Sequence, residues 1–288
     1  FISSDLGKKK LLGRSFGSAQ QVINISVLKE FGVSLPALPE QQKIASFLSA
    51  VDEKIQKLRR KKALLEQYKK GVMQQIFSQQ IRFKDEKGNP YPDWEEKRLK
   101  DLVEKDRKIR YGIVQPGEYD PEGRFMIRGQ DYSSVKGWAE STEFFKVSAV
   151  VEQKYKKARV KAGDLLITIV GAGTGWLEVV PSFLDGANIT QTTGRIAINK
   201  EVASPGYVKN YFLSNNGRKE INKYIKGQAQ PGLNIGDVEI FKLPLPCKEE
   251  QQHIADYLMK LDLQIISLLN EIENTQDFKK GLLQKMFV

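Results

Sequence analysis

Positively charged side chains alternate with aromatic and amide side chains in several polar segments between residues 108 and 230. Lysine and arginine neutralise phosphates, whereas arginine and glutamine form paired hydrogen bonds with the edges of guanine and adenine. Each segment alone also fits a solvated loop, but together they predict contact with a nucleic acid by at least two of them. The candidate side chains are Lys108, Arg110, Tyr111, Arg128, Gln130, Lys154, Lys156, Lys157, Thr174, Gln191, Thr192, Lys226, Gln228 and Gln230.

The overall charge points to the same class of partner. The 288 residues carry a formal net charge of +11, which favours a polyanion, with nucleic acid as the first candidate and a membrane surface as the second. No apolar run reaches the length of a membrane span, and the first residues do not resemble a signal peptide. We therefore expect a cytoplasmic protein.

The sequence offers little for catalysis. Cys247 is the only cysteine and His253 the only histidine, which excludes an intramolecular disulfide, a cysteine-based zinc site and a histidine-containing triad elsewhere. The glycine-rich segment 171–176 lacks the residues of a phosphate-binding loop, and we interpret it as a hairpin turn, or as a loop that approaches a DNA backbone. We interpret residues 89–92 as a turn. We predict no catalytic residue, no metal site and no bound cofactor.

One long segment occurs twice. A shift of 210 residues superimposes residues 38–77 on residues 248–287 without a gap, so that Glu40 falls on Glu250 and Gly71 on Gly281. The same shift matches residues 1–37 with residues 211–247. We therefore expect residues 1–37 to be the C-terminal part of an incomplete first domain whose second copy is complete.

Both copies of the repeated segment have the apolar spacing of a coiled coil. Apolar residues recur every seven positions with a second row between them, which predicts two long helices, at residues 38–78 and 246–288, that pair with each other. The residues expected in the helix–helix contact are Ile44, Leu48, Val51, Ile55, Leu58 and Leu65 in the first helix, and Ile254, Leu258, Leu261, Ile265 and Leu268 in the second.

The charges of the two helices differ. The first contains the basic run 59–62, whereas the second contains Glu271, Glu273 and Asp277. In an antiparallel pair these groups could face each other and set the orientation, although each exposed ion pair contributes at most about 1 kcal/mol.

The segment between the helices predicts a separate domain. A linker centred on residues 88–92 leads into residues 84–245, where short apolar runs alternate with glycine and proline turn signals. The fold class that we expect is α+β: a mixed α/β domain with a curved sheet, together with two long antiparallel coiled-coil helices.

With the repeat assembled, the chain resembles the specificity subunits (HsdS) of type I restriction-modification systems. The resemblance is carried by the segment from Pro36 to Gly71 and its copy from Leu245 to Gly281. Weaker matches are residues 111–116, 163–167 and 227–234. The resemblance extends over essentially the whole chain.

The resemblance implies a non-catalytic protein that reads double-stranded DNA. Residues 84–245 would be a target-recognition domain for one half of a bipartite site, and the helices would set the gap between the halves. The helices would also dock methyltransferase subunits, which recruit restriction subunits. Those partners would carry S-adenosylmethionine, ATP and Mg, and self-association is a further expectation. A coiled-coil adaptor without DNA specificity is the alternative.

Overall fold

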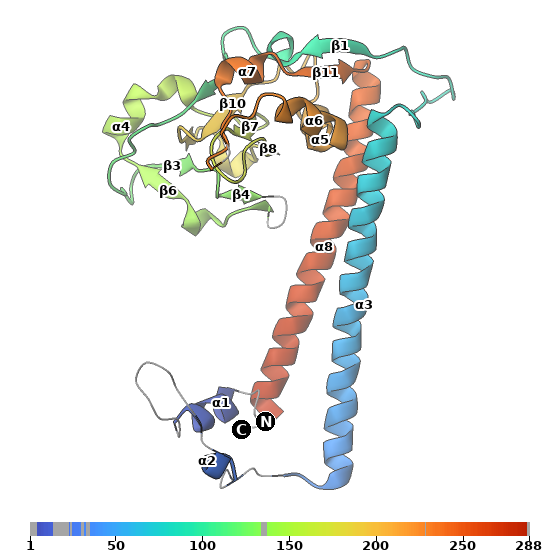
Figure 1. The fold of residues 1–288 in the computed structure, drawn as a ribbon, viewed down its shortest axis with the longest axis vertical. Helices are drawn as coiled ribbons and strands as arrows, with labels where there is room; N and C mark the ends of the chain where they lie inside the picture. Colours follow the sequence, from blue (N-terminus) through green and yellow to red (C-terminus); the bar gives the residue numbers. More distant parts are fainter. Residues whose placement is uncertain are drawn as a thin grey trace. The chain divides into compact units, whose positions relative to one another are not determined.

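The chain divides into two compact units. The computed structural model describes residues 5–13, 23, 25–29, 32, 35–133, 137–227 and 229–286. The first unit contains residues 1–68 and 261–288, and the second contains residues 69–260. The two long helices, α3 (Leu38–Phe77) and α8 (Lys248–Met286), each contribute to both units (Figure 1).

The first unit is helical in its described part. It contains α1 (Asp5–Leu12), α2 (Ile25–Lys29), α3 up to residue 68 and α8 from residue 261. Lys54 forms an ion pair with Glu271 at 3.3 Å, and Asp52 accepts a hydrogen bond from Lys279 at 2.5 Å. Because the partner number rises along α8 as it falls along α3, the two helices run antiparallel.

The heptad residues lie on the protected face of each helix. In α3, Val51 and Ile55 are buried and the other expected contact residues are half-buried. In α8, Leu261 and Leu268 are buried, with Ile265 half-buried between them. Within the second unit the same rows continue as buried side chains at Val72, Ile76, Ile254 and Leu258.

The predicted pairing of the basic run 59–62 in α3 with Glu271 in α8 is wrong. Glu271 pairs with Lys54, whereas Lys62, in the basic run, pairs with Glu66 on its own helix at 2.8 Å. The run 59–62 lies about 8 to 12 Å further along α3 than Lys54, at 1.5 Å per residue. The apolar seam sets the register, and the basic run falls out of reach of Glu271.

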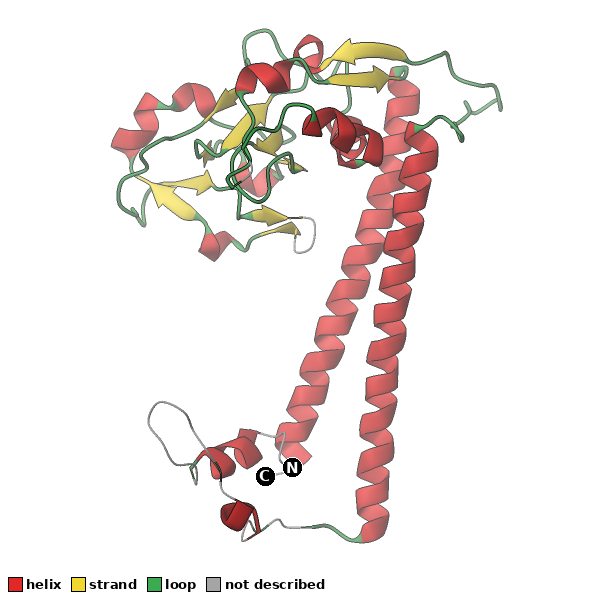
Figure 2. Cartoon of the chain, in the orientation of Figure 1, coloured by secondary structure: helices red, strands yellow, loops and turns green. Residues whose placement is uncertain are grey.

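The second unit contains the described strands (Figure 2). A four-stranded antiparallel sheet has the order β2 (Arg110–Tyr111), β10 (Thr193–Ile196), β7 (Leu165–Thr168) and β8 (Leu177–Val179). A three-stranded mixed sheet has the order β6 (Phe145–Val147), β3 (Arg124–Ile127) and β9 (Asn188–Ile189). Two-stranded pairs join β1 (Glu95–Arg98) with β11 (Lys242–Leu245), and β4 (Tyr132–Ser133) with β5 (Gly137–Trp138).

Short helices fill the remaining positions of this unit. They are α4 (Ala149–Lys154), α5 (Pro205–Leu213), α6 (Asn215–Asn222) and α7 (Ile235–Glu239), with 3-10 turns η1 (Leu99–Leu102), η2 (Ser141–Glu143), η3 (Lys156–Ala158) and η4 (Ser182–Leu184). Helices α5 and α6 are separated at Ser214, whose hydroxyl accepts a hydrogen bond from the Gly217 amide at 3.3 Å and begins α6.

The apolar runs of the sequence form the core. All four residues of β7 are buried, as expected for a strand covered on both faces. Leu166 packs with Ile127, Phe144 and Ile189 in one apolar cluster, so the two larger sheets share a core. Gly112, directly after β2, lets the chain pass this core closely, since a Cβ there would lie 1.7 Å from the Ile189 carbonyl oxygen.

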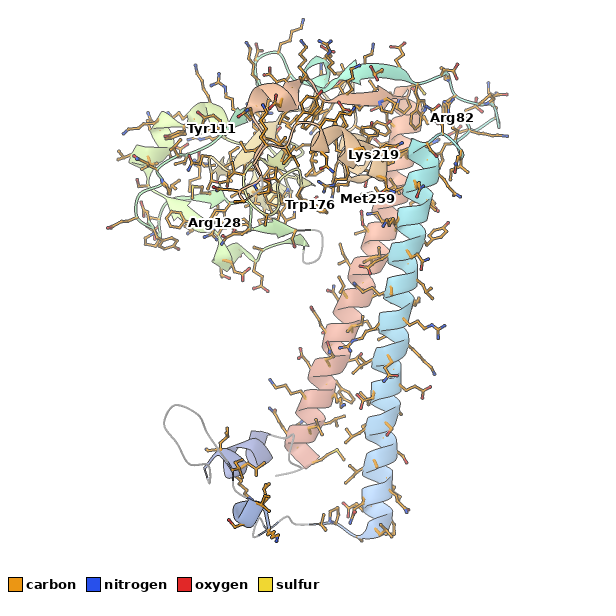
Figure 3. All side chains as sticks on the ribbon, in the orientation of Figure 1. Arg82, Tyr111, Arg128, Trp176, Lys219 and Met259 are labelled. Carbon is orange, nitrogen blue, oxygen red and sulfur yellow. The ribbon has the colours of Figure 1, made fainter. Side chains whose placement is uncertain are left out.

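A buried carboxylate anchors the linker between the helices. Glu250, with 0% of its side chain exposed, accepts hydrogen bonds from Arg82 Nη2 at 2.8 Å and from the Trp94 indole at 2.8 Å. Arg82 also donates to the carbonyl oxygens of Tyr91 and Pro92 and lies over the Trp94 ring (Arg82 is labelled in Figure 3). The linker is therefore folded onto the start of α8.

These observations confirm the α+β fold class with long helices and sheets. Helix α3 begins at Leu38, where it was expected, and α8 begins at Lys248, two residues after its expected start. The recognition domain expected at residues 84–245 lies within the second unit. The expected remnant at residues 1–37 lies partly outside the described residues and stays a prediction. None of the described helices combines the length and apolar composition needed to cross a lipid bilayer.

Leu268→Ala should destabilise the helix pair. Leu268 is 6% exposed in the seam, so its truncation should cost about 2 to 4 kcal/mol, whereas Leu263→Ala on the same helix, where the side chain is 57% exposed, should change stability by less than about 0.5 kcal/mol. Thermal unfolding followed by circular dichroism measures both. Equal effects of the two variants would contradict the seam.

Glu250→Gln should destabilise the second unit. The substitution keeps the shape of the side chain but leaves Arg82 without its buried counter-charge, at an expected cost of about 2 to 3 kcal/mol. Glu249→Gln is the matched control, because Glu249 is the exposed neighbour on the same helical turn. Denaturant unfolding measures the difference, and wild-type stability of Glu250→Gln would refute a structural role of the carboxylate.

Candidate nucleic-acid interface

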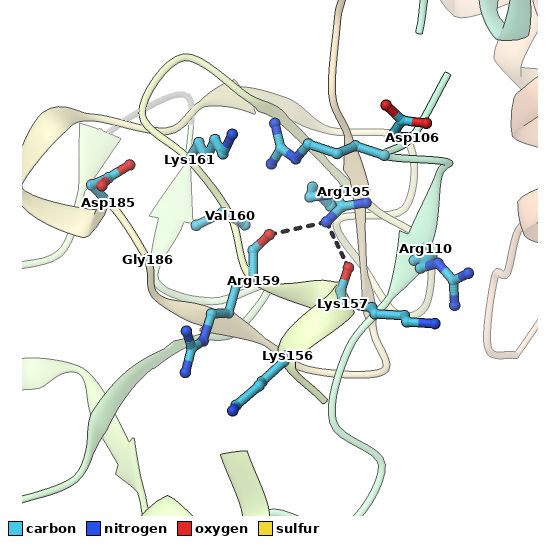
Figure 4. A pocket seen from close by; sticks show the side chains of 11 residues that line it. Asp106, Arg110, Lys156, Lys157, Arg159, Val160, Lys161, Asp185, Gly186 and Arg195 are labelled. Atoms are coloured by element: carbon cyan, nitrogen blue, oxygen red, sulfur yellow. Dashed lines mark hydrogen bonds between the residues drawn. The ribbon is translucent and has the colours of Figure 1, made fainter. Parts of the chain in front are cut away.

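Basic side chains gather around one groove in the second unit. The groove has a volume of about 510 Å³ and lies beside β2 and β10 (Figure 4). Its basic lining residues are Arg107, Arg110, Lys156, Lys157, Arg159, Lys161 and Arg195, with Asp106 and Asp185 as the acidic ones. Two of the expected segments, around residue 110 and from 154 to 161, are thus brought together.

Arg195 holds these two segments in place. It is 3% exposed in β10 and donates from Nη1 to the carbonyl oxygens of Lys157 at 2.7 Å and Arg159 at 3.0 Å, and from Nη2 to that of Lys108 at 2.8 Å. Burial, followed by repulsion from Arg107, lowers the pKa of Arg195. No carboxylate is hydrogen-bonded to Arg195 among the described residues, so its positive charge is solvated by backbone carbonyls and remains under the groove.

Two other arginines of the groove are paired with acids. Arg107 forms an ion pair with buried Asp164, and Arg159 forms one with buried Glu152. The Arg159 guanidinium lowers the pKa of the Glu152 carboxyl through this hydrogen bond. The exposed side chains of Lys156 and Lys157 form no ion pair with a described residue, so they remain available for an external anion.

An aromatic groove continues from the basic one. It has a volume of about 710 Å³ and shares Arg110, Lys156 and Lys157 with its neighbour. Tyr111, 51% exposed, and half-buried Tyr155 line it together with exposed Lys154. Lys108 is exposed nearby in sequence but lines neither groove. The arrangement offers cations for phosphates and a ring face for stacking.

A third groove collects the expected amide and hydroxyl groups. Its volume is about 560 Å³, and Gln130, Gln191 and Thr192 line it beside the glycine-rich turn that connects β7 and β8. Gln130 and Gln191 are exposed, and their side-chain amides make no hydrogen bond to another described residue. Their donor and acceptor groups are free to read a base edge.

Two expected contact residues have their polar atoms engaged inside the protein. The Arg128 guanidinium donates to both carboxylate oxygens of Asp131 and to the Glu143 carbonyl oxygen. The Thr174 hydroxyl donates to the carbonyl oxygens of Gly171 at 2.6 Å and Pro231 at 3.0 Å. This arrangement disfavours direct base contact through these atoms, although Arg128 still lines the third groove.

The last expected segment is only partly described. Lys226 is exposed and forms an ion pair with Asp237 at 3.3 Å, and Gln230 is exposed outside the three grooves. Gln228 lies outside the described residues. The structure therefore does not bring Lys226 and Gln230 together with the grooves.

The floor of the third groove is a buried polar pair that the sequence did not reveal. The Tyr132 hydroxyl lies 3.0 Å from the hydroxyl of Thr168, which lines the groove. Burial raises the pKa of Tyr132 to about 12, so the phenol keeps its proton at neutral pH. Arg159, Lys161, Thr190 and Arg195 also line the grooves. They belong to the polar segments 154–161 and 190–195 but were not among the individual side chains expected to contact DNA.

The described residues contain no cluster of histidine, cysteine or acidic side chains that could hold a metal ion. The Nδ1 atom of His253, on α8, lies 3.2 Å from the Tyr91 hydroxyl. His253 therefore contacts the linker that is folded onto the start of α8.

Comparison with known proteins gives a consistent result. The family model of the type I restriction modification DNA specificity domain matches residues 3–67 and 91–275. The MjaVIII specificity subunit of Methanocaldococcus jannaschii is 24% identical over 98% of this chain and 67% of its own length. The EcoBI specificity subunit of Escherichia coli is 24% identical over 90% of this chain and 58% of its own length.

Solved structures agree in fold. A chain of a type I restriction-modification complex studied for its assembly and conformational transition has a TM-score of 0.61 at 17% identity, covering 99% of this chain and 68% of that one. The S subunit from M. genitalium has a TM-score of 0.59 at 14% identity, covering 98% and 70%. The 288 residues thus span about 60 to 70% of these relatives. Because the family model matches most of the 288 residues of this chain, the chain belongs to the family of type I restriction-modification DNA specificity domains.

Proposed function

We propose that this chain recognises a DNA sequence as the specificity component of a type I restriction-modification enzyme. The observation that carries the proposal is the junction of two basic segments across one groove, with an aromatic groove adjoining it. Family membership and the names of the curated relatives support it.

The grooves suggest a division of tasks. Lys156, Lys157 and Arg110 would neutralise phosphates and orient the duplex, which contributes affinity without sequence preference. Gln130 and Gln191, whose amides are free, would read base edges, with adenine as the preferred partner of a paired amide contact. One recognition domain of this kind would read one half of a bipartite site.

The chemistry would belong to partner subunits. The long helices α3 and α8 would dock methyltransferase subunits, and restriction subunits would join through them. S-adenosylmethionine, ATP and Mg would bind to those partners, and this chain would contribute no catalytic group.

Purification with a methyltransferase subunit of the same system, followed by mapping of methylated positions, tests the proposal. We expect methylation within a defined sequence and a shift of duplex DNA by the complex in a low-salt gel. DNA modified without sequence preference, or a complex that does not bind DNA at low salt, would favour an adaptor without DNA specificity.

The double substitution of Lys156 and Lys157 by alanine should weaken DNA binding uniformly across sequences. Each lost phosphate contact removes about 0.9 from the slope of log affinity against log salt, so the slope should fall by about 2. Lys219→Ala is the control, because exposed Lys219 lies on α6 away from the grooves (Figure 3). An unchanged slope would show that these lysines do not contact phosphates.

Gln191→Ala should instead alter sequence preference. Loss of a paired amide contact should reduce discrimination at one base pair by about 1 to 3 kcal/mol while the salt slope stays constant. Binding to a randomised DNA library measures the preference, with exposed Gln264→Ala on α8 as the control. If the preferred sequence stayed the same, Gln191 would not read a base.

A further inference from the structure

The glycine-rich turn between β7 and β8, residues 171–175, forms one wall of the third groove. Ala172 and Gly173 line the groove, with Val170 directly before the turn. Three of the five residues of the turn are glycines, so its backbone has little conformational preference of its own. Because Ala172 and Gly173 present almost no side chain, the course of the backbone sets this wall, and contacts from outside the turn must fix that course.

The end of the turn that follows β7 is tied to the loop before α7. The Gly171 amide donates to the Pro231 carbonyl oxygen at 3.0 Å, and the Thr174 hydroxyl donates to the same oxygen at 3.0 Å. The Leu233 amide donates to the Ile169 carbonyl oxygen at 2.8 Å. Backbone groups and one hydroxyl therefore hold this end.

The end that precedes β8 is held by helix α6. The Gly175 amide donates to the Thr168 carbonyl oxygen at 2.8 Å and continues the ladder between β7 and β8. The Gly175 carbonyl oxygen accepts a hydrogen bond from Arg218 Nη1 at 2.6 Å. Gly175 has a φ of +81°, and a Cβ there would lie 2.8 Å from Ile221 Cγ2, so α6 packs directly against this glycine.

Arg218 makes this contact without a counter-ion. Its side chain is half-buried, burial lowers its pKa, and no charged side chain among the described residues offsets that burial. Its Cζ lies 5.4 Å from the centroid of the Trp176 ring, the first residue after the turn (Trp176 is labelled in Figure 3). An apolar side chain would pack here without this desolvation cost but could not donate to the Gly175 carbonyl.

We propose that Arg218 is a positioning residue for sequence recognition, which fixes the glycine-rich wall of the third groove from behind. The inference rests on the proposed function, in which Gln130 and Gln191 read base edges in this groove. Arg218 lines none of the three grooves, so it acts through the turn and does not touch DNA. A paired amide contact needs close placement of the base, so a displaced wall changes which base pair fits rather than the attraction for phosphates.

Arg218→Met in the full chain, purified with a methyltransferase subunit, tests the inference. Methionine fills much of the same space but cannot donate to the Gly175 carbonyl. In a randomised DNA library, discrimination at the base pair read through the third groove should fall at least about fivefold. The slope of log affinity against log salt should stay constant, because no phosphate contact is lost. Arg218→Lys keeps a charged donor and should restore preference toward that of the wild type.

Two controls separate this role from stability and from charge. Lys209→Met removes the ion pair between α5 and Glu178 on β8, and Lys219→Met removes an exposed cation from α6. Lys209→Met should lower the unfolding temperature, yet both controls should keep the wild-type preference. The double variant Arg218→Met with Gln191→Ala should discriminate no worse than Gln191→Ala alone, because both act on one contact.

Hydrogen exchange tests the positioning of the turn without DNA. Amides of residues 171–176 should exchange at least about fivefold faster in Arg218→Met, since one hydrogen bond is lost, and at the wild-type rate in Lys219→Met. Unchanged exchange in Arg218→Met, unchanged preference, or additive effects with Gln191→Ala would overturn the inference. A wild-type complex without sequence preference would instead overturn the proposed function and with it the role in recognition, while the exchange rates would still show whether Arg218 holds the turn.

Discussion

The buried carboxylate of Glu250 is the constraint around which the second unit is arranged. A fully buried charge must be matched by donors, and Arg82 and Trp94 supply them from a segment that would otherwise be a free linker. Meeting this requirement brings Trp94 to the start of α8, and β1 follows Trp94 directly into its pairing with β11. One electrostatic requirement thus fixes the entry of the recognition domain and the start of the second long helix.

The long helices could be predicted because their signal is local and repeated. Seven-residue spacing over several turns identifies the protected face of each helix, and the structure buries or half-buries the expected positions. The ion pairs could not be predicted from composition, because a partner depends on the register between helices. A difference of a few residues separates Lys54, which reaches Glu271, from the basic run at 59–62.

The candidate site was predictable in its exposed cations but not in its internal contacts. Lys156 and Lys157 were identified from charge alone, whereas the engagement of Arg128 with Asp131 depends on the turn that joins β3 to β4. Asp131 lies three residues after Arg128, so spacing did carry a weak signal. The contacts of Arg195 carry no such spacing signal, because its partners are backbone carbonyls of residues 108, 157 and 159, which only the fold brings together.

Arg107 and Arg195 illustrate how the groove retains its charge. Arg107 is neutralised by Asp164, so it joins the chain segments without adding net charge. Arg195 meets its desolvation cost with carbonyl dipoles, which stabilise a cation but do not cancel it. Its charge therefore adds to that of Lys156 and Lys157, which line the same groove. The low dielectric constant of the surrounding core screens the Arg195 charge only weakly. A buried arginine held by the backbone can thus orient the basic segments and raise their attraction for a phosphate at the same time.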